Sequence, residues 1–187
     1  MRITGGKFGG RILKTPKSDA VRPTQDRVRE ALFSILVEAV PGTRFLDLYA
    51  GSGAVGLEAL SRGAADVRWI EGDRTIARTT AENVKAIAGE GFATAVVTAD
   101  AERWLRAAPA KTHFDIVFAD PPYETARNDG LAGLAALLAE KEIVAPGGIF
   151  VAEVPIDATV AAAPGWATVR DRVYGKTRLV IRQRTTD

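Results

Sequence analysis

Hydrophobic residues along the chain follow two alternating patterns. Short runs rich in apolar, β-branched and aromatic residues, typical of buried strands, are RFLDLY, DVRWIE, TAVVTA, FDIVFA and GGIFVAEV. Between these runs, apolar residues recur at helical spacing and predict helices over about residues 54–61, 75–87 and 129–140, and a short helix from residue 101. Because strands and helices alternate, the pattern predicts a doubly wound α/β fold around a parallel sheet.

The two ends of the chain depart from this alternation. The C-terminal segments ATVRDRV and TRLVIRQ are joined by the turn YGK, which leaves no room for a crossover helix, so they predict a closing antiparallel pair. Residues 1–15 predict two short strands around a glycine-rich turn, a small β-hairpin arm. Residues 22–40 predict a helix with Thr24 as its N-cap. We therefore expect an N-terminal arm and helix over residues 1–40 and a larger domain over residues 41–187.

Composition narrows the class of protein. A length of 187 residues with 47% hydrophobic content allows one domain with a sizeable core. The chain has no cysteine, which excludes disulfides, thiolate zinc sites and a cysteine nucleophile. No apolar run approaches the ~20 residues of a membrane span, and MRITGGKFGG lacks the apolar stretch of a signal peptide. We therefore expect a cytoplasmic protein.

The formal net charge of +2 conceals an uneven distribution. Residues 1–30 contain eight Lys or Arg against three acids, and residues 170–184 contain six against one, so each segment carries +5 while the segment between them carries −7. Two basic ends around an acidic middle favour a polyanionic partner, with nucleic acid as the first candidate. The basic residues of the arm that could neutralise phosphates are Arg2, Lys7, Arg11, Lys14 and Lys17.

A glycine-rich segment follows the first predicted strand. In LDLYAGSGAVGLEAL, Gly51, Gly53 and Gly56 have the spacing GxGxxG at the point where a strand leads into a helix. Glycines there allow a tight turn and a close approach of the backbone to a ligand. The spacing serves dinucleotides and S-adenosylmethionine alike, and Glu71, at the end of the next strand, suits the ribose hydroxyls of either.

Two further acids favour S-adenosylmethionine over a dinucleotide. Asp47 lies four residues before Gly51, where a carboxylate is unfavourable beside a pyrophosphate but suits an ammonium and a sulfonium. Asp100 ends the third predicted strand and can accept a hydrogen bond from an adenine amino group, while the N–H of Ala101 meets a ring nitrogen. Each acid alone could instead be a helix cap. Acids at three successive strand ends lie at the edge where such sheets bind ligands, so together they favour a cofactor site.

The segment DIVFADPPYET ends the fourth predicted strand with two prolines. Proline has a fixed φ and no N–H, so Pro121 and Pro122 end the strand and hold its exit extended, between Asp120 and Tyr123. An isolated Pro-Pro is usually only a stiff turn. Together with the glycine loop, this segment resembles the site of amino-group methyltransferases. In that reading the Asp120 carboxylate and the Pro121 carbonyl accept the hydrogens of the amino group, and Tyr123 stacks on the base. Such a transfer depends on positioning and requires no metal.

Five segments together resemble the RsmD family, bacterial enzymes that methylate N2 of a guanine in small-subunit ribosomal RNA. They are MRITGGKFGGRIL, RPTQDRVREALFSIL, FLDLYAGSGAVGLEALSRGA, VFADPPY and RVYGKTRLVI, in this order over nearly the whole chain. The resemblance implies a Rossmann-like class I methyltransferase fold with a mostly parallel seven-stranded sheet. It implies that the residues binding S-adenosylmethionine are Thr24, Asp47, Ala50, Gly51, Gly53, Glu71, Asp100 and Ala101, and that those handling the guanine are Asp120, Pro121, Pro122 and Tyr123.

The expected substrate is 16S ribosomal RNA displayed by the small ribosomal subunit or its assembly intermediate, because phosphate contacts from a short arm position an RNA without reading its sequence. An N6-adenine methyltransferase acting on DNA or RNA is the alternative, since DPPY serves adenine equally. An NAD-linked dehydrogenase would leave DPPY unexplained. A nucleic-acid-binding module without activity would not need Asp47, Glu71, Asp100 and Asp120 together.

Overall fold

The computed structural model describes residues 1–15, 23–109, 112–122 and 130–186, without the side chains of residues 23–25. Its helices are η1 (Gly6–Phe8), α1 (Pro23–Ile35), α2 (Ala54–Ser61), α3 (Arg74–Ala88), α4 (Glu90–Ala93), α5 (Ala101–Ala107) and α7 (Gly130–Glu140). Its strands are β1 (Arg44–Leu48), β2 (Asp66–Glu71), β3 (Val96–Thr98), β4 (Phe114–Ala119), β5 (Val144–Pro155), β6 (Trp166–Tyr174) and β7 (Thr177–Arg184). The predicted alternation is confirmed, and the short helix α4 is an addition to it.

The strands form a seven-stranded sheet in the order β3-β2-β1-β4-β5-β7-β6. Strands β1 to β5 pair in parallel, and β7 runs antiparallel between β5 and β6. The predicted α/β class and its antiparallel C-terminal pair are therefore confirmed. The chain moves outward from β1 in one direction to β2 and β3 and in the other to β4 and β5. This reversal places a ligand crevice at the carboxyl ends of β1 and β4.

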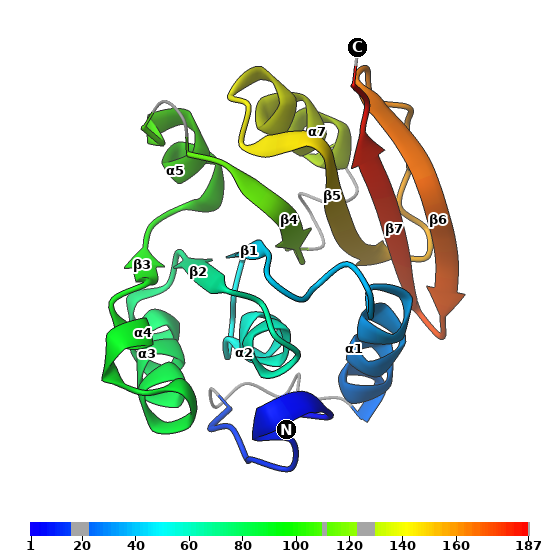
Figure 1. Ribbon diagram of the computed structural model, residues 1–187. Coiled ribbons are helices and arrows are strands. Elements are labelled where there is room, and N and C mark those ends of the chain that lie inside the picture. The colour runs from blue at the N-terminus through cyan, green and yellow to red at the C-terminus, as the bar shows by residue number, and fades with distance from the viewer. Residues whose placement is uncertain (16–22, 110–111, 123–129, 187) are drawn as a thin grey trace.

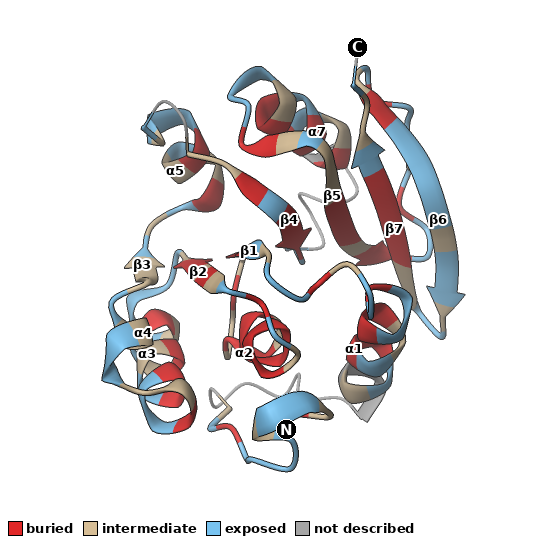
Figure 2. Ribbon diagram, in the orientation of Figure 1, coloured by how far each residue is buried: buried red, intermediate tan, exposed pale blue. Residues whose placement is uncertain are grey.

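Helices cover both faces of the sheet (Figure 1). Helices α1, α2 and α3 lie with the N-terminal arm on one side, and α5 and α7 lie on the other. Each side has its own apolar core, with Leu57 and Val151 in the first and Leu134 and Phe150 in the second. The edge strand β6 is mostly exposed, whereas β7 beside it is buried over Leu179–Arg182 (Figure 2).

Helix α1 begins at Pro23, one residue before the expected N-cap. Thr24 therefore lies inside the first turn, and the prediction that it caps the helix is wrong. Proline at the first helical position explains this start, because its fixed φ matches the helix and its missing N–H would have had no partner within the helix. The side chain of Thr24 lies outside the described residues, so its role near the cofactor stays a prediction.

The N-terminal arm, residues 1–15, is packed onto the domain. Its two limbs meet in one antiparallel bridge between Arg2 and Ile12, with η1 between them, which is the expected hairpin in a shortened form. Ile3 and Leu13 are buried in the core on the α1–α3 side. The arm is therefore anchored by its own apolar residues, and its polar residues lie on a fixed surface.

Glu58 of α2 joins the arm to two helices. Its buried carboxylate accepts hydrogen bonds from the N–H and the hydroxyl of Thr4 at 2.8 and 2.7 Å, from Nε of Arg62 at 2.9 Å and from Nε of Arg29 at 3.2 Å. Burial opposes the ionisation of Glu58, but these donors outweigh it and lower its pKa. The ionised carboxylate thus fixes the arm and α1 against α2.

Candidate active site

The loop between β1 and α2 has a backbone shape that glycine permits. Gly51 and Gly53 have φ of 55° and 78°, in the left-handed region where other residues are strained. A Cβ at Gly53 would lie 2.8 Å from the methyl carbon of Thr80 on α3. The hydroxyl of Thr80 also donates a hydrogen bond to the carbonyl of Gly51. The glycines therefore let this loop lie tightly against α3.

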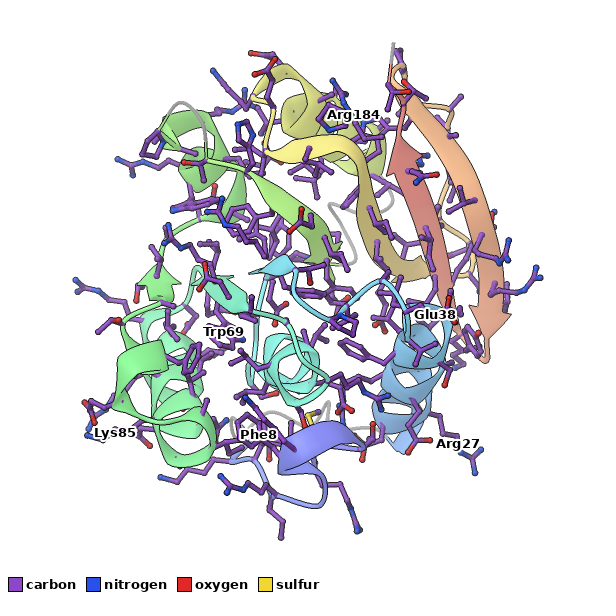
Figure 3. The ribbon with its side chains drawn as sticks, in the orientation of Figure 1. Phe8, Arg27, Glu38, Trp69, Lys85 and Arg184 are labelled. Carbon is purple, nitrogen blue, oxygen red and sulfur yellow. The ribbon has the colours of Figure 1, made fainter. Side chains whose placement is uncertain are left out.

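Asp47, at the end of β1, holds the start of α2. Its Oδ2 accepts a hydrogen bond from the N–H of Gly56 at 2.9 Å, and the residue is 1% exposed. Gly56 allows close helix–sheet packing, since a Cβ there would lie 2.3 Å from Nε1 of Trp69 on β2. Figure 3 shows the Trp69 side chain on the side of the sheet where α2 and α3 lie. Burial raises the pKa of Asp47 well above its usual value. The Gly56 N–H opposes this rise, and the charges of Asp120 and Glu71 add to it. Its contact with the cofactor ammonium stays a prediction.

Glu71, at the end of β2, reaches across to the glycine loop. Its Oε2 accepts a hydrogen bond from the N–H of Gly51 at 2.9 Å, and its Oε1 accepts one from the N–H of Asp73 at 2.9 Å. Each carboxylate oxygen has two lone pairs, so the side chain keeps acceptor capacity for hydroxyl groups. The structure brings Glu71 and the loop together, as their positions at neighbouring strand ends indicated, while the ribose contact stays a prediction.

Asp100 caps helix α5. Its Oδ1 accepts a hydrogen bond from the N–H of Arg103 at 2.9 Å, which is the structural role that the sequence had left open. Ala101, the first residue of α5, is buried. Tyr49, in the glycine loop, has φ of 61°, and burial together with the charges of Glu102 and Asp100 raises the pKa of its hydroxyl to about 12. The adenine contact of Asp100 and Ala101 stays a prediction.

Asp120 follows β4 directly and keeps an exposed surface. Pro121 is buried and Pro122 is exposed, so the strand exit is anchored on one side. The surrounding protein still displaces much of the water around Asp120, and this desolvation raises its pKa to about 6. Asp120 is thus ionised at neutral pH and can accept hydrogen bonds. Tyr123 lies outside the described residues, so its stacking role stays a prediction.

A cavity of about 210 Å³ lies at these strand ends. Three carboxyl groups line it, from Asp47 on β1, Asp120 after β4 and Glu153 on β5. The glycine loop, helix α1 and the arm complete the wall through Ala50, Gly51, Arg29, Leu32, Met1 and Thr15. Of the predicted cofactor residues, Gly53, Glu71, Asp100 and Ala101 do not line this cavity. Glu71 ends β2, and Asp100 and Ala101 lie after β3.

Several residues of this cavity were not predicted from the sequence. Glu153 had a signal, because it is an acid inside the otherwise apolar segment GGIFVAEV. Arg29 and Met1 had none, since Arg29 is one of several charged residues of an amphipathic helix and Met1 reaches the cavity only because the arm folds back. No local pattern indicates contacts of this kind.

The basic residues of the arm are partly engaged by the domain itself. Arg11 donates a hydrogen bond to a backbone carbonyl of α3 at 2.7 Å, and Lys14 pairs with an exposed α3 carboxylate at 3.0 Å. Lys7 and Arg2 are exposed, and Nζ of Lys7 lies 4.8 Å from the centre of the Phe8 ring. Lys17 lies outside the described residues. Their contact with RNA stays a prediction, which Lys7 tests best because it is exposed and forms no salt bridge among the described residues.

Neither a metal site nor a membrane span is found in the part of the chain that the structure describes. No group of three or more His, Cys, Asp or Glu side chains there could hold a metal ion. No helix there has both the length and the apolar character needed to cross a bilayer.

Comparisons with known proteins agree on one family. The family described as Conserved hypothetical protein 95 matches residues 1–183. The Ribosomal RNA small subunit methyltransferase D of Escherichia coli K12 is 37% identical over 186 residues, which cover 98% of this chain and 90% of that protein. Its counterpart of the same name in Haemophilus influenzae is 32% identical over 176 residues, covering 94% and 89%. The solved structure of the putative methyltransferase yhhF from Escherichia coli has a TM-score of 0.86 and 35% identity, covering 100% and 99%.

The strand order, the glycine loop and the acids at the strand ends define a Rossmann-like methyltransferase that uses S-adenosylmethionine. Within this class, the family match and the curated relatives show that the chain belongs to the RsmD family, which its sequence motifs resemble.

Glu71→Ala is expected to weaken S-adenosylmethionine binding roughly tenfold or more, because it removes a charge-assisted hydrogen bond of ~1.5–3 kcal/mol. The loop also loses the acceptor that holds the N–H of Gly51. Calorimetric titration of the native and variant proteins measures the change, with NAD as a ligand that should not bind. Equal affinity for NAD, or an unchanged affinity in the variant, would contradict the assignment of Glu71.

Proposed function

We propose that the protein transfers the methyl group of S-adenosylmethionine to the exocyclic N2 of a guanine in 16S ribosomal RNA, carried by the small ribosomal subunit or its assembly intermediate. The names of its relatives support ribosomal RNA as the substrate. The observation that carries the site assignment is that Asp120 lies on the same cavity as the glycine loop. A hydrogen-bond acceptor for the target base thus stands beside the expected place of the methyl donor. A ribosomal substrate places the protein in the cytoplasm.

The cavity fits the positively charged methionine end of the cofactor. Three carboxyl groups face it, whereas the guanidinium of Arg29 is already paired with Glu58 at 3.2 Å and with Asp26 at 3.1 Å. A bound ammonium and sulfonium favour the ionised forms of Asp47 and Asp120 and are stabilised by their charges. The residues that would hold the cofactor are then Asp47, Ala50, Gly51, Gly53 and Thr24 at the methionine end, Glu71 at the ribose, and Asp100 with Ala101 at the adenine.

Asp120 and the carbonyl of Pro121 would prepare the amino group of the base. The lone pair of guanine N2 is delocalised into the ring, which makes this nitrogen a weak nucleophile. Two acceptors that draw its hydrogens out of the ring plane localise the lone pair and orient it. When bound, S-adenosylmethionine supplies a methyl group that is already activated, so these residues contribute mainly by positioning. The two prolines keep the acceptors still, because each has a fixed φ.

The methylated nucleoside tests this function directly. Small subunits from a bacterial strain lacking its own family member are incubated with the protein and S-adenosylmethionine, and the digested RNA is analysed by mass spectrometry. We expect N2-methylguanosine at one site. N6-methyladenosine in its place would show that the target amino group belongs to adenine, and the absence of any product would show that the substrate is wrong.

Small subunits are expected to be methylated far better than a naked hairpin carrying the same guanine, because a folded surface displays the base. Lys7→Glu should weaken docking on subunits and lower the slope of log affinity against log salt by about one unit, since a phosphate contact is lost. Affinities and tritiated methyl transfer at several salt concentrations measure both effects. Lys141→Glu is the matched control, because Lys141 is exposed and follows α7 on the opposite side of the sheet. Equal rates on both substrates, or equal salt slopes for the two variants, would place recognition elsewhere.

A further inference from the structure

Glu153 lies next to Asp120 at the carboxyl edge of the sheet. In the parallel pairing of β4 and β5, Phe118 is opposite Val151 and Ala119 is opposite Ala152, and Asp120 and Glu153 are the next residues of the two segments. Because side chains alternate along a strand, Asp120 and Glu153 lie on the face of Phe118 and Val151, which is the face covered by α1. Both side chains line the same cavity.

Neither carboxyl group is used by the surrounding fold. Among the residues that the structure describes, no N–H group and no Ser, Thr or Tyr hydroxyl donates a hydrogen bond to Asp120 or Glu153, whereas Asp47 and Glu58 accept such bonds. Glu153 is half-buried on a strand, so it is not a freely solvated surface acid. A half-buried carboxyl group without a hydrogen-bond partner costs free energy. Such a group at a cavity therefore indicates a functional role.

The charged groups around Glu153 come from three elements. Asp120 follows β4, Asp47 ends β1, and Arg29 projects from α1, and all three line the cavity. Arg29 is the cationic side chain among the described residues of this wall, and it donates its hydrogen bonds to Glu58, to Asp26 and to a carbonyl of the arm. Glu153 therefore faces two acids and one cation that is already paired.

We propose that Glu153 is a positioning residue for methyl transfer, whose neutral carboxyl group donates its O–H to the Asp120 carboxylate and holds it toward the amino group of the base. This proposal rests on the acceptor role of Asp120 given above. Asp120 then has one oxygen fixed by Glu153 and the other free to accept from the base. As the new N–C bond forms, S-adenosylhomocysteine leaves, and the methylated amino group then releases one proton to water. Glu153 keeps its own hydrogen throughout the transfer.

The electrostatics of the pair agree with this arrangement. Burial raises the pKa of Glu153 to about 8, the charge of Asp120 adds to this rise, and Arg29 opposes it. Desolvation raises the pKa of Asp120 only to about 6. The two groups titrate together, and the larger rise in the pKa of Glu153 favours the proton on Glu153 while Asp120 is ionised. Below about pH 6 Asp120 becomes protonated and loses its acceptor function, and above about pH 8 Glu153 ionises and the two carboxylates repel each other.

The pH dependence of single-turnover methyl transfer tests the proposal in native protein, Glu153→Gln and Glu153→Ala, between about pH 5 and pH 9. The native profile should rise through an acidic limb and fall through an alkaline one. Glu153→Gln keeps a neutral N–H donor, so it should retain roughly a third or more of the maximal rate and its acidic limb, but lose the alkaline limb that Glu153 causes. Glu153→Ala should fall about tenfold at its maximum. Ionisation of guanine itself affects all three proteins equally.

An alkaline limb of native size in Glu153→Gln, or a loss in that variant as large as in Glu153→Ala, would overturn the proposal. Asp120→Ala, measured in parallel, separates this outcome from a failure of the proposed function. If Asp120→Ala stays active, Asp120 is not the acceptor and both ideas fall. If Asp120→Ala is inactive and the Glu153→Gln profile matches the native one, only the role of Glu153 falls. Cofactor affinity by calorimetry confirms that each variant is folded.

Discussion

Asp120→Ala is expected to reduce single-turnover methyl transfer roughly 100-fold or more, because it removes a preorganised acceptor at the reacting nitrogen. Asp120→Asn keeps a carbonyl oxygen and should lose only about tenfold. The ordering separates two roles, since an obligatory base would make both variants equally inactive. Rapid-mixing transfer to small subunits measures the rates, and calorimetry with S-adenosylmethionine confirms that both variants still bind the cofactor.

The pH profile gives a second check on Asp120. Desolvation raises its pKa to about 6, so its acceptor form is present above this value and is lost as the pH falls through it. The native rate should therefore decrease in acid, whereas the residual rate of Asp120→Asn should not share this limb. Full activity of Asp120→Ala, or an acidic limb that survives in Asp120→Asn, would assign the chemistry to another group.

Glu58→Ala is expected to lower the free energy of unfolding by about 3–5 kcal/mol, because it leaves the buried guanidinium of Arg29 without its main partner. The arm also loses the acceptor for the N–H and the hydroxyl of Thr4. Denaturant unfolding measures the change. Glu82→Ala is the matched control, since among the described residues Glu82 pairs only with exposed Lys14 and Arg78, and its loss should scarcely move the midpoint.

Acidification should also lower the free energy of unfolding, as Glu58→Ala does, because it protonates Glu58. The folded state lowers the pKa of this carboxyl group below its unfolded value. The stabilisation is therefore fully present above the unfolded pKa and is lost as the pH falls through the folded one. Glu58→Ala should show a weaker acid dependence than the native protein. A decrease of less than about 1 kcal/mol in the free energy of unfolding of Glu58→Ala would mean that the hydrogen bonds of Glu58 contribute little to stability and that packing alone holds the arm.

The order and type of the elements around the site could be predicted from the sequence. Residues 54–61 and 66–71 were predicted with the bounds found for α2 and β2, because their apolar spacing and the turns that flank them are local. Two predictions about the N-terminal segment differed from the structure, each for a physical reason. The cap assigned to Thr24 ignored the stronger preference of Pro23 for the first helical position. The hairpin of the arm is shortened to a single bridge around η1, and Ile3 and Leu13 anchor it in the core on the α1–α3 side.

What the sequence by itself determined is the set of groups at the strand ends: the glycine loop, Asp47, Glu71, Asp100 and the start of DPPY. Parallel strands put their carboxyl ends at one edge, so local pattern is enough to gather these groups. Only the tertiary structure decided what each one contacts. In the folded protein Asp100 caps α5, Asp47 accepts a hydrogen bond from the N–H of Gly56, and Glu153 lies beside Asp120. The reason is that strand register and the approach of α1 depend on packing between distant segments, which the period of a single segment does not record.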